Sequence, residues 1–220
     1  MKNYLTVPTA GEAEFIEKRS RFIGHISPVS TLKDANSFIE NIRSQHKKAN
    51  HNCFGFILRE GGVERMSDDG EPKGTAGPPI LEVVRRENIV DVAVVVTRYF
   101  GGVLLGAGGL IRAYSSATKL AIDKVGIAEM CVCQDVALVI PYTMYQQFTK
   151  LLVDYPVKVL NVDFARDVNV SLRFRAESIG EFEVALSELS AGKVKPELLD
   201  KLFAPMGVDF QLKTPINHNR

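Results

Sequence analysis

The first half of the chain alternates between apolar patterns typical of strands and patterns typical of helices. Loose alternation over residues 13–29 predicts one bent strand, and the continuous apolar run Val92–Val96 predicts a buried strand. Gly61-Gly62 predicts a hairpin turn between two further strands. The predicted strands are residues 13–29, 53–58, 63–66 and 90–97. The predicted helices are residues 32–48, a segment that starts at Pro78-Pro79, and residues 108–124. Ser30 or Thr31 can cap the first helix, and Gly126 can end the last one.

The second half has a different rhythm, in which strands and helices follow the order βαββαβ. The predicted strands are residues 136–140, 157–164, 168–176 and 208–212, and the predicted helices are residues 143–153 and 178–189. This order is that of the ferredoxin-like split βαβ sandwich. We therefore expect an α+β protein with one domain at 1–128, a ferredoxin-like domain at 134–212, and a polar, disordered tail at 213–220.

Composition excludes several classes of protein. Hydrophobic residues make up 45% and charged residues 24%, as in ordinary globular domains, and the net charge is +1. No stretch approaches the roughly 18 apolar residues of a membrane span, so we expect no membrane association. The absence of a secretory signal pattern and the odd, sparse set of three cysteines predict a cytoplasmic protein.

The most informative segment is a glycine-rich loop between the buried strand and the following helix. Five glycines fall within residues 101–109, and arginines stand at both ends of the segment. A loop that leads from a strand into a helix N-terminus presents backbone N–H groups to anions. The segment lacks the Lys and Ser/Thr of a P-loop, because Ala107 and Gly108 stand there. The candidate residues for binding nucleic acid or another anion are Lys73, Arg98, Tyr99, Gly101, Gly102, Gly106, Gly108, Gly109 and Arg112; the alternative is a purely structural turn.

A second segment, residues 67–77, carries three carboxylates: Asp68, Asp69 and Glu71. They could bind a divalent cation or serve as general acid and base. The simpler interpretation, which we favour, is an acidic turn in which Asp-Gly supplies the bend and Asp68 caps a backbone N–H. A metal loop needs more ligands than this segment offers, so we predict no metal ion and no cofactor.

The cysteines offer weaker candidates. His51 and Cys53 lie on one predicted strand and could face the same way, as in a Cys/His nucleophile pair. Cys131 and Cys133 could form half of a zinc site, but no second pair of ligands exists. Buried, unreactive thiols are the better interpretation of all three.

Three motifs in fixed order resemble the IMPACT family. They are Ser67–Pro72 followed by Gly74–Gly77, then Val96–Gly102, then Leu105–Tyr114, and the resemblance covers about residues 13–126. It implies a first domain with the ribosomal protein S5 domain-2-like fold. It also implies a ferredoxin-like second domain similar to the last domain of elongation factor G.

The resemblance also implies a role in translation, which eukaryotic members regulate, and suggests that bacterial members bind nucleic acid or the ribosome. Our leading hypothesis is a non-catalytic, translation-associated regulator that binds RNA or the ribosome through the glycine loop, with protein partners in translation control also open. The first alternative is an enzyme acting on a phosphorylated small molecule or nucleotide, with the acidic loop holding a metal. The second alternative is a protein-interaction module whose glycines are structural.

Overall fold

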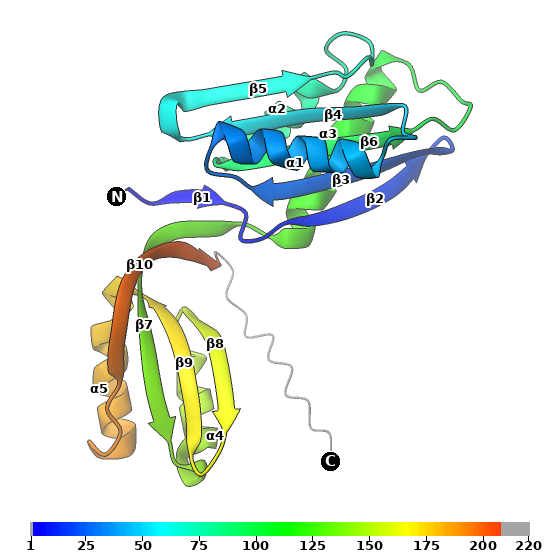
Figure 1. Cartoon of the computed structure of the whole chain (residues 1–220). Coiled ribbons are helices and arrows are strands. Elements are labelled where there is room, and N and C mark those ends of the chain that lie inside the picture. Colours follow the sequence, from blue (N-terminus) through cyan, green and yellow to red (C-terminus); the bar gives the residue numbers. More distant parts are fainter. Residues whose placement is uncertain (1, 208–220) are drawn as a thin grey trace. The chain divides into compact units, whose positions relative to one another are not determined.

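The computed structural model describes residues 2–207, which form two compact units (Figure 1). One unit is Tyr4–Glu129, and the other contains the described residues from Met130 onward together with the first residues of the chain. The architecture is α+β, as the sequence predicts. No helix within residues 2–207 is both long enough and apolar enough to cross a membrane.

The first unit is built on a five-stranded sheet of strand order β2-β3-β6-β4-β5, in which each neighbouring pair is antiparallel. Its elements are β1 (Tyr4–Thr6), β2 (Gly11–Glu17), β3 (Ser20–Pro28), α1 (Leu32–Gln45), β4 (His51–Leu58), β5 (Val63–Ser67), α2 (Gly77–Arg86), β6 (Val92–Tyr99) and α3 (Ala107–Val125), with a short 3-10 turn at Glu60–Gly62.

Strand β6 lies at the centre of this sheet and is buried on both faces. Val92, Val94 and Val96 pack with α2 and α3, whereas Ala93 and Val95 pack with α1. Side chains alternate along a strand, so a strand covered on both faces must be apolar at every position. This requirement explains the continuous apolar run. Figure 1 shows α1 across one face of the sheet, with α2 and α3 behind the other.

Helix α1 begins where the sequence predicts. Thr31 is its N-cap: the Thr31 hydroxyl accepts from the backbone N–H of Asp34 at 3.1 Å, and the Asp34 carboxylate accepts from the backbone N–H of Thr31 at 3.0 Å. This reciprocal capping box satisfies two donors that the helix itself cannot pair. At the end of α3, Gly126 with φ of 75° is the predicted stop.

The single strand predicted over residues 13–29 is wrong. The segment forms a hairpin of β2 and β3, in which Glu17 pairs with Ser20 across a two-residue turn. Lys18 and Arg19 occupy the turn with φ of 45° and 67°. Such turns are usually recognised by Asn-Gly or Asp-Gly, because left-handed backbone is unfavourable for other residues. Lys-Arg carries no such signal.

The second unit has the βαββαβ order of the predicted ferredoxin-like fold. Its elements are β7 (Ala128–Ile140), α4 (Tyr142–Leu152), β8 (Val157–Phe164), β9 (Val168–Arg175), α5 (Ile179–Ser190) and β10 (Glu197–Gly207), with a 3-10 turn at Ala176–Ser178. Strand β7 pairs with β9 and with β10, and β8 pairs with the other edge of β9. The predicted strand at 208–212 and the predicted tail at 213–220 lie outside the described residues. The last described strand, β10, precedes them.

We expect His25 to make the stability of the first unit depend on pH. It is buried on β3, its Nδ1 lies 3.1 Å from Glu12 Oε2, and its ring centroid is 5.0 Å from that of His46 at the end of α1. Burial and the neighbouring His46 lower the pKa of His25, although Glu12 opposes the shift. The unfolded chain therefore binds a proton at a higher pH than the folded protein does, and stability falls as the pH drops below the ordinary histidine value of about 6.5.

We predict that His25→Leu flattens this pH dependence. Urea unfolding midpoints of the native chain should fall between pH 7 and pH 5, and those of the variant should fall less over the same interval. Glu12→Gln should steepen the loss, because it removes the carboxylate that favours the protonated ring. Equal slopes in all three proteins would show that His25 does not set the dependence.

Candidate nucleic-acid interface

The glycine loop connects the central strand β6 to helix α3. Gly106 is the N-cap of α3 with φ of 72° and ψ of 166°, a conformation that only glycine adopts readily. No side chain caps this helix start. The first N–H groups of a helix have no partner within the helix, and they carry partial positive charge.

The predicted glycines have separate roles. Gly101 lies against the β2–β3 turn: a Cβ there would lie 2.0 Å from the Arg19 carbonyl carbon, and the Gly101 N–H donates to Ser20 Oγ at 3.1 Å. Gly101 is therefore a close-packing position and is not free to approach a ligand. A Cβ on Gly109 would meet Leu105, and one on Gly108 would lie 3.7 Å from a guanidinium nitrogen of Arg112.

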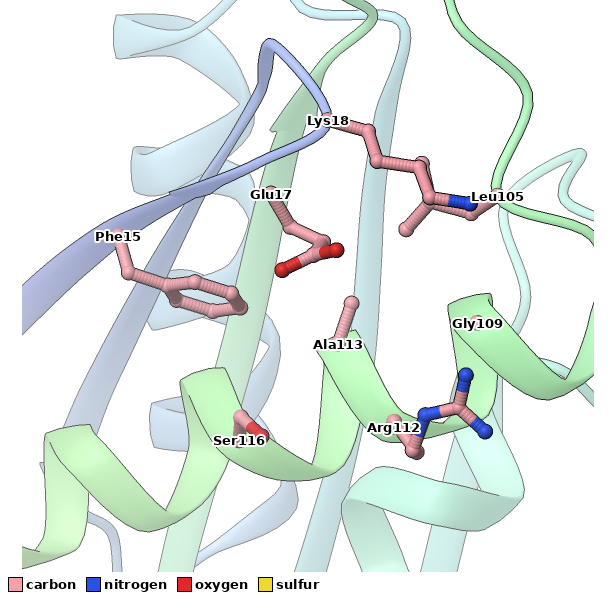
Figure 2. Close-up of a pocket in the computed structure, with 8 residues that line it drawn as sticks. All are labelled: Phe15, Glu17, Lys18, Leu105, Gly109, Arg112, Ala113 and Ser116. Carbon is pink, nitrogen blue, oxygen red and sulfur yellow. The ribbon is translucent and has the colours of Figure 1, made fainter.

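The exposed part of the candidate interface combines apolar and cationic side chains. Leu104 is 81% exposed at the tip of the loop, and Phe100 is 43% exposed at its beginning. Arg112 is exposed and turns back along the first turn of α3, where it lines a pocket together with Lys18 (Figure 2). Neither cation takes part in any ion pair among the residues that the structure describes.

Arg98 does not lie where a phosphate contact requires it. It is 5% exposed, and its Nη1 donates to Glu71 Oε1 at 2.6 Å. Its guanidinium carbon lies 5.5 Å from the ring centroid of Phe22 and 5.4 Å from that of Phe100. Arg98 therefore supports the loop from beneath. Tyr99 is half-buried, and its hydroxyl lies 2.9 Å from His46 Nδ1.

The carboxylates of the acidic loop hold the loop to its surroundings. Asp68 accepts from the backbone N–H groups of Gly74, Ala76 and Gly77 at 2.8 to 3.0 Å. Partial burial acts to raise the pKa of Asp68, but the three hydrogen bonds together lower it by more. The pKa of Asp68 therefore lies below its ordinary value. Asp69 accepts from the backbone N–H of Asn52 at 2.7 Å. Lys73 is exposed on the same loop.

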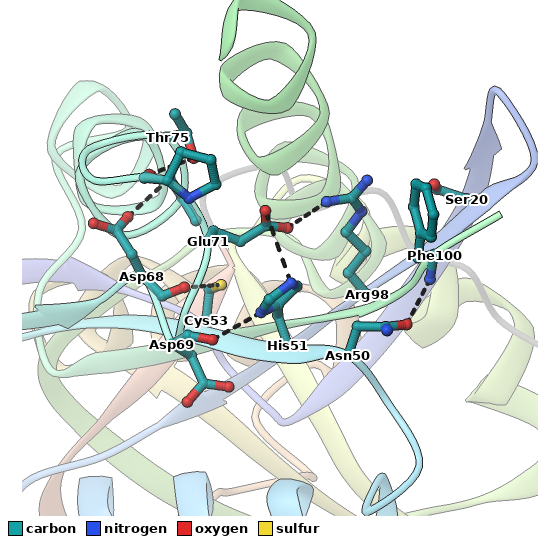
Figure 3. Close-up of polar contacts among 12 residues, drawn as sticks. Ser20, Asn50, His51, Cys53, Asp68, Asp69, Glu71, Thr75, Arg98 and Phe100 are labelled. Atoms are coloured by element: carbon teal, nitrogen blue, oxygen red, sulfur yellow. Dashed lines mark hydrogen bonds and ion pairs between the residues drawn. The ribbon is translucent and has the colours of Figure 1, made fainter. Parts of the chain in front are cut away.

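Glu71 is the centre of a buried polar cluster (Figure 3). Its Oε1 accepts from Arg98 and also from the hydroxyl of Tyr114 on α3, at 2.7 Å. Burial raises the pKa of Tyr114, which keeps its hydroxyl protonated as a donor. His51 Nδ1 donates to the carbonyl of Asp69 at 2.8 Å, which directs Nε2 toward Glu71 Oε2 at 3.9 Å.

Cys53 belongs to the same cluster, in surroundings that do not favour a nucleophile. Its thiol donates to the Asp68 carbonyl at 3.0 Å, and burial raises its pKa to about 12. The reactive species of cysteine is the thiolate, which is absent at neutral pH under these conditions. Cys131 and Cys133 are buried in a small apolar core with Ala204 and Met206.

The acidic residues point to different partners and do not converge on a common point (Figure 3). Within residues 2–207, no group of three or more His, Cys, Asp or Glu side chains is arranged to hold a metal ion. The loop 67–77 is thus anchored to β4, β6 and α3 by Asp69, Glu71 and Cys53.

The sequence analysis did not identify Tyr114 or Lys18 as site residues. Tyr114 continues the apolar face of α3, and Lys18 lies in a turn without a turn signal.

The acidic loop and the glycine loop both lie in a segment that matches a known protein family. The Impact N-terminal domain model matches residues 18–122, which include the β3 strand, the acidic loop and the glycine loop. Together with the 36% identity to a family member that covers most of both chains, this match shows that the chain belongs to the IMPACT family.

Individual relatives extend the similarity over both units. The chain is 36% identical over 194 residues to the IMPACT family member YvyE of Bacillus subtilis, covering 88% of this chain and 89% of the relative. It is 27% identical over 123 residues to Protein IMPACT of Rattus norvegicus, covering 53% of this chain and 38% of that protein. A crystal structure described as a hypothetical protein matches with a TM-score of 0.57 at 28% identity, over 91% of this chain and 98% of the other.

We predict that breaking the buried Glu71–Arg98 pair destabilises the first unit far more than breaking an exposed pair does. Glu71→Ala leaves the Arg98 guanidinium and the Tyr114 hydroxyl buried without an acceptor, which should cost about 3–5 kcal/mol of unfolding free energy. The matched control is Glu14→Ala, which breaks the exposed Glu14–Arg21 pair and should cost less than about 1 kcal/mol. Denaturant unfolding measures both.

A double variant separates the ion pair from simple loss of packing. Glu71→Leu combined with Arg98→Met removes both charges, and it should be less destabilised than Glu71→Ala because no buried charge remains unpaired. If Glu71→Ala proved no more destabilising than Glu14→Ala, the cluster would not anchor the loop.

Proposed function

We propose that this protein is a non-catalytic, translation-associated regulator that binds RNA or the ribosome through the glycine loop and the start of α3. The observation that carries the proposal is the exposed Arg112 guanidinium, without a carboxylate partner in the described structure, beside the uncapped start of α3. Membership of the IMPACT family supports the link to translation that the motifs imply.

The chemistry of this surface suits a phosphate backbone. Phosphate contacts in nucleic-acid complexes come from arginine and lysine side chains, backbone N–H groups and helix N-termini. Gly106, Gly108 and Gly109 contribute no side chains of their own to the start of α3, the space around Gly106 is open, and Arg112 adds a full charge. Phe100 offers a partly exposed ring for stacking on an unpaired base. Lys73 and Gly102 extend the proposed surface, while Arg98, Tyr99 and Gly101 hold it in position.

The proposal places the protein in the cytoplasm, where ribosomes act. A protein partner in translation control is the second candidate, and the exposure of Val103 and Leu104 favours it. Apolar side chains at the tip of a loop contribute little to phosphate contacts and much to protein interfaces.

We predict salt-sensitive co-sedimentation of the purified full chain with ribosomes, weakened by Arg112→Ala. Each phosphate contact contributes close to one unit to the slope of log affinity against log salt, so the variant should bind more weakly and with a slope shallower by about one unit. The matched control is Arg65→Ala on β5, which removes the same charge at the opposite edge of the sheet from β2 and should leave both quantities unchanged.

Two outcomes contradict the proposal. If the native chain fails to sediment with ribosomes at low salt, the ribosome is not its partner. If Arg112→Ala and Arg65→Ala weaken binding equally, overall charge is responsible and the glycine loop is not the contact surface.

A further inference from the structure

A pocket of about 250 Å³ lies between the β2–β3 hairpin and the first turns of α3 (Figure 2). Its apolar wall is formed by Phe15 and Leu105, and its polar groups are Glu17, Lys18, Arg112 and Ser116. Pockets that enclose drug-sized ligands begin at roughly 300 Å³. This volume therefore suits a single base, with the phosphate of its nucleotide at the exposed Lys18 and Arg112 side chains, and is too small for a dinucleotide cofactor.

The pocket contains charged side chains of both signs. Lys18 from the hairpin and Arg112 from α3 are cations that approach from opposite sides, and the carboxylate of Glu17 points into the space between Phe15 and Lys18 (Figure 2). None of the three forms an ion pair within the described residues. A ligand that satisfies all of them carries an anionic group and, a short distance away, hydrogen-bond donors.

The apolar wall adds a third requirement. Phe15 is partly buried and stacks on Phe22, with 5.5 Å between ring centroids, so its ring is held in a fixed orientation. A planar, partly apolar group with donors on one edge can pack against such a ring. A nucleotide combines the planar base, the donor edge and the phosphate in one molecule.

The Glu17 carboxylate discriminates among the bases. Its two oxygens only accept hydrogen bonds. Guanine presents two adjacent donors, N1–H and the N2 amino group, on its Watson–Crick edge. Adenine and cytosine place an acceptor beside their amino donor, and uracil places acceptors on both sides of its single N–H. A carboxylate therefore pairs best with guanine.

We infer that this pocket binds a guanine nucleotide, with the base against Phe15, its donor edge at Glu17 and its phosphate at Arg112 and Lys18. This inference rests on the proposed function for the source of the nucleotide, which is an unpaired guanosine of RNA. A free guanine nucleotide has the same chemistry, and the experiment distinguishes the two sources.

The experiment is a titration of the ¹⁵N-labelled full chain with GMP, AMP, CMP, UMP and guanosine, followed by amide chemical shifts. GMP should bind about tenfold to a hundredfold more tightly than the other nucleotides, the discrimination expected of a bidentate base contact. The largest shifts should fall at Gly109, Arg112 and Ser116. Four nucleotides binding equally, or no binding, would overturn the inference.

Two variants test the assigned contacts separately. Glu17→Gln should abolish the preference for GMP while nucleotides still bind, because an amide carries one donor and one acceptor. Glu14→Gln, on the opposite face of β2, is the matched control and should keep the preference. Arg112→Ala combined with Lys18→Ala should reduce GMP affinity to that of guanosine, because it removes both phosphate contacts. A GMP preference that survives Glu17→Gln would contradict the role of Glu17.

Ribosome co-sedimentation with saturating GMP separates this inference from the proposed function. Displacement by GMP, but not by AMP, assigns the pocket to RNA guanosine. GMP binding without any ribosome association supports the pocket with a free nucleotide as its ligand, and contradicts the proposed function. Ribosome association that persists in a protein with no affinity for GMP overturns the pocket and leaves the proposed function standing.

Discussion

The ion pair between Glu71 and Arg98 is the interaction on which the candidate interface depends. Moving two charges out of water is expensive, and a buried pair is tolerated only where further hydrogen bonds and favourable contacts complete it. Here the Tyr114 hydroxyl gives Glu71 a second donor, and the rings of Phe22 and Phe100 lie near the guanidinium. The pair connects the acidic loop to the end of β6, and Tyr114 connects both to α3. The glycine loop therefore starts from a fixed base.

The burial of Arg98 shows what a sequence can and cannot predict about this site. Side chains alternate along β6, so Val92, Val94 and Val96 face α2 and α3. Arg98 is the next residue on this same face. Extending the apolar pattern by one step would have placed Arg98 in the interior. Its partner could not have been found in this way, because Glu71 lies in an irregular loop whose path depends on Asp68 and its three backbone donors.

The fold was more predictable than the site, for a physical reason. Long apolar periods determine α1, α3 and β6, because burial of one face or two is the dominant favourable term in folding. The β2–β3 turn was missed because Lys18 and Arg19 adopt left-handed backbone without the residues that favour it. Strand β7 extends well beyond the predicted residues 136–140, since Cys131 and Cys133 continue its alternation into a small second core.

The strained β2–β3 turn is supported by direct packing against the glycine loop. Left-handed backbone costs roughly 1–2 kcal/mol for each ordinary residue, so Lys18 and Arg19 need support from their surroundings. Gly101 supplies it: its backbone packs directly on Arg19 and donates to Ser20, an approach that any Cβ would prevent. Lys18 and Arg112, which lie on separate elements, are thereby held on opposite sides of one pocket. Strain of this kind persists where the surrounding structure over-determines it, and it is concentrated at functional sites. Gly101 itself does not line the pocket; it supports the turn that carries Lys18.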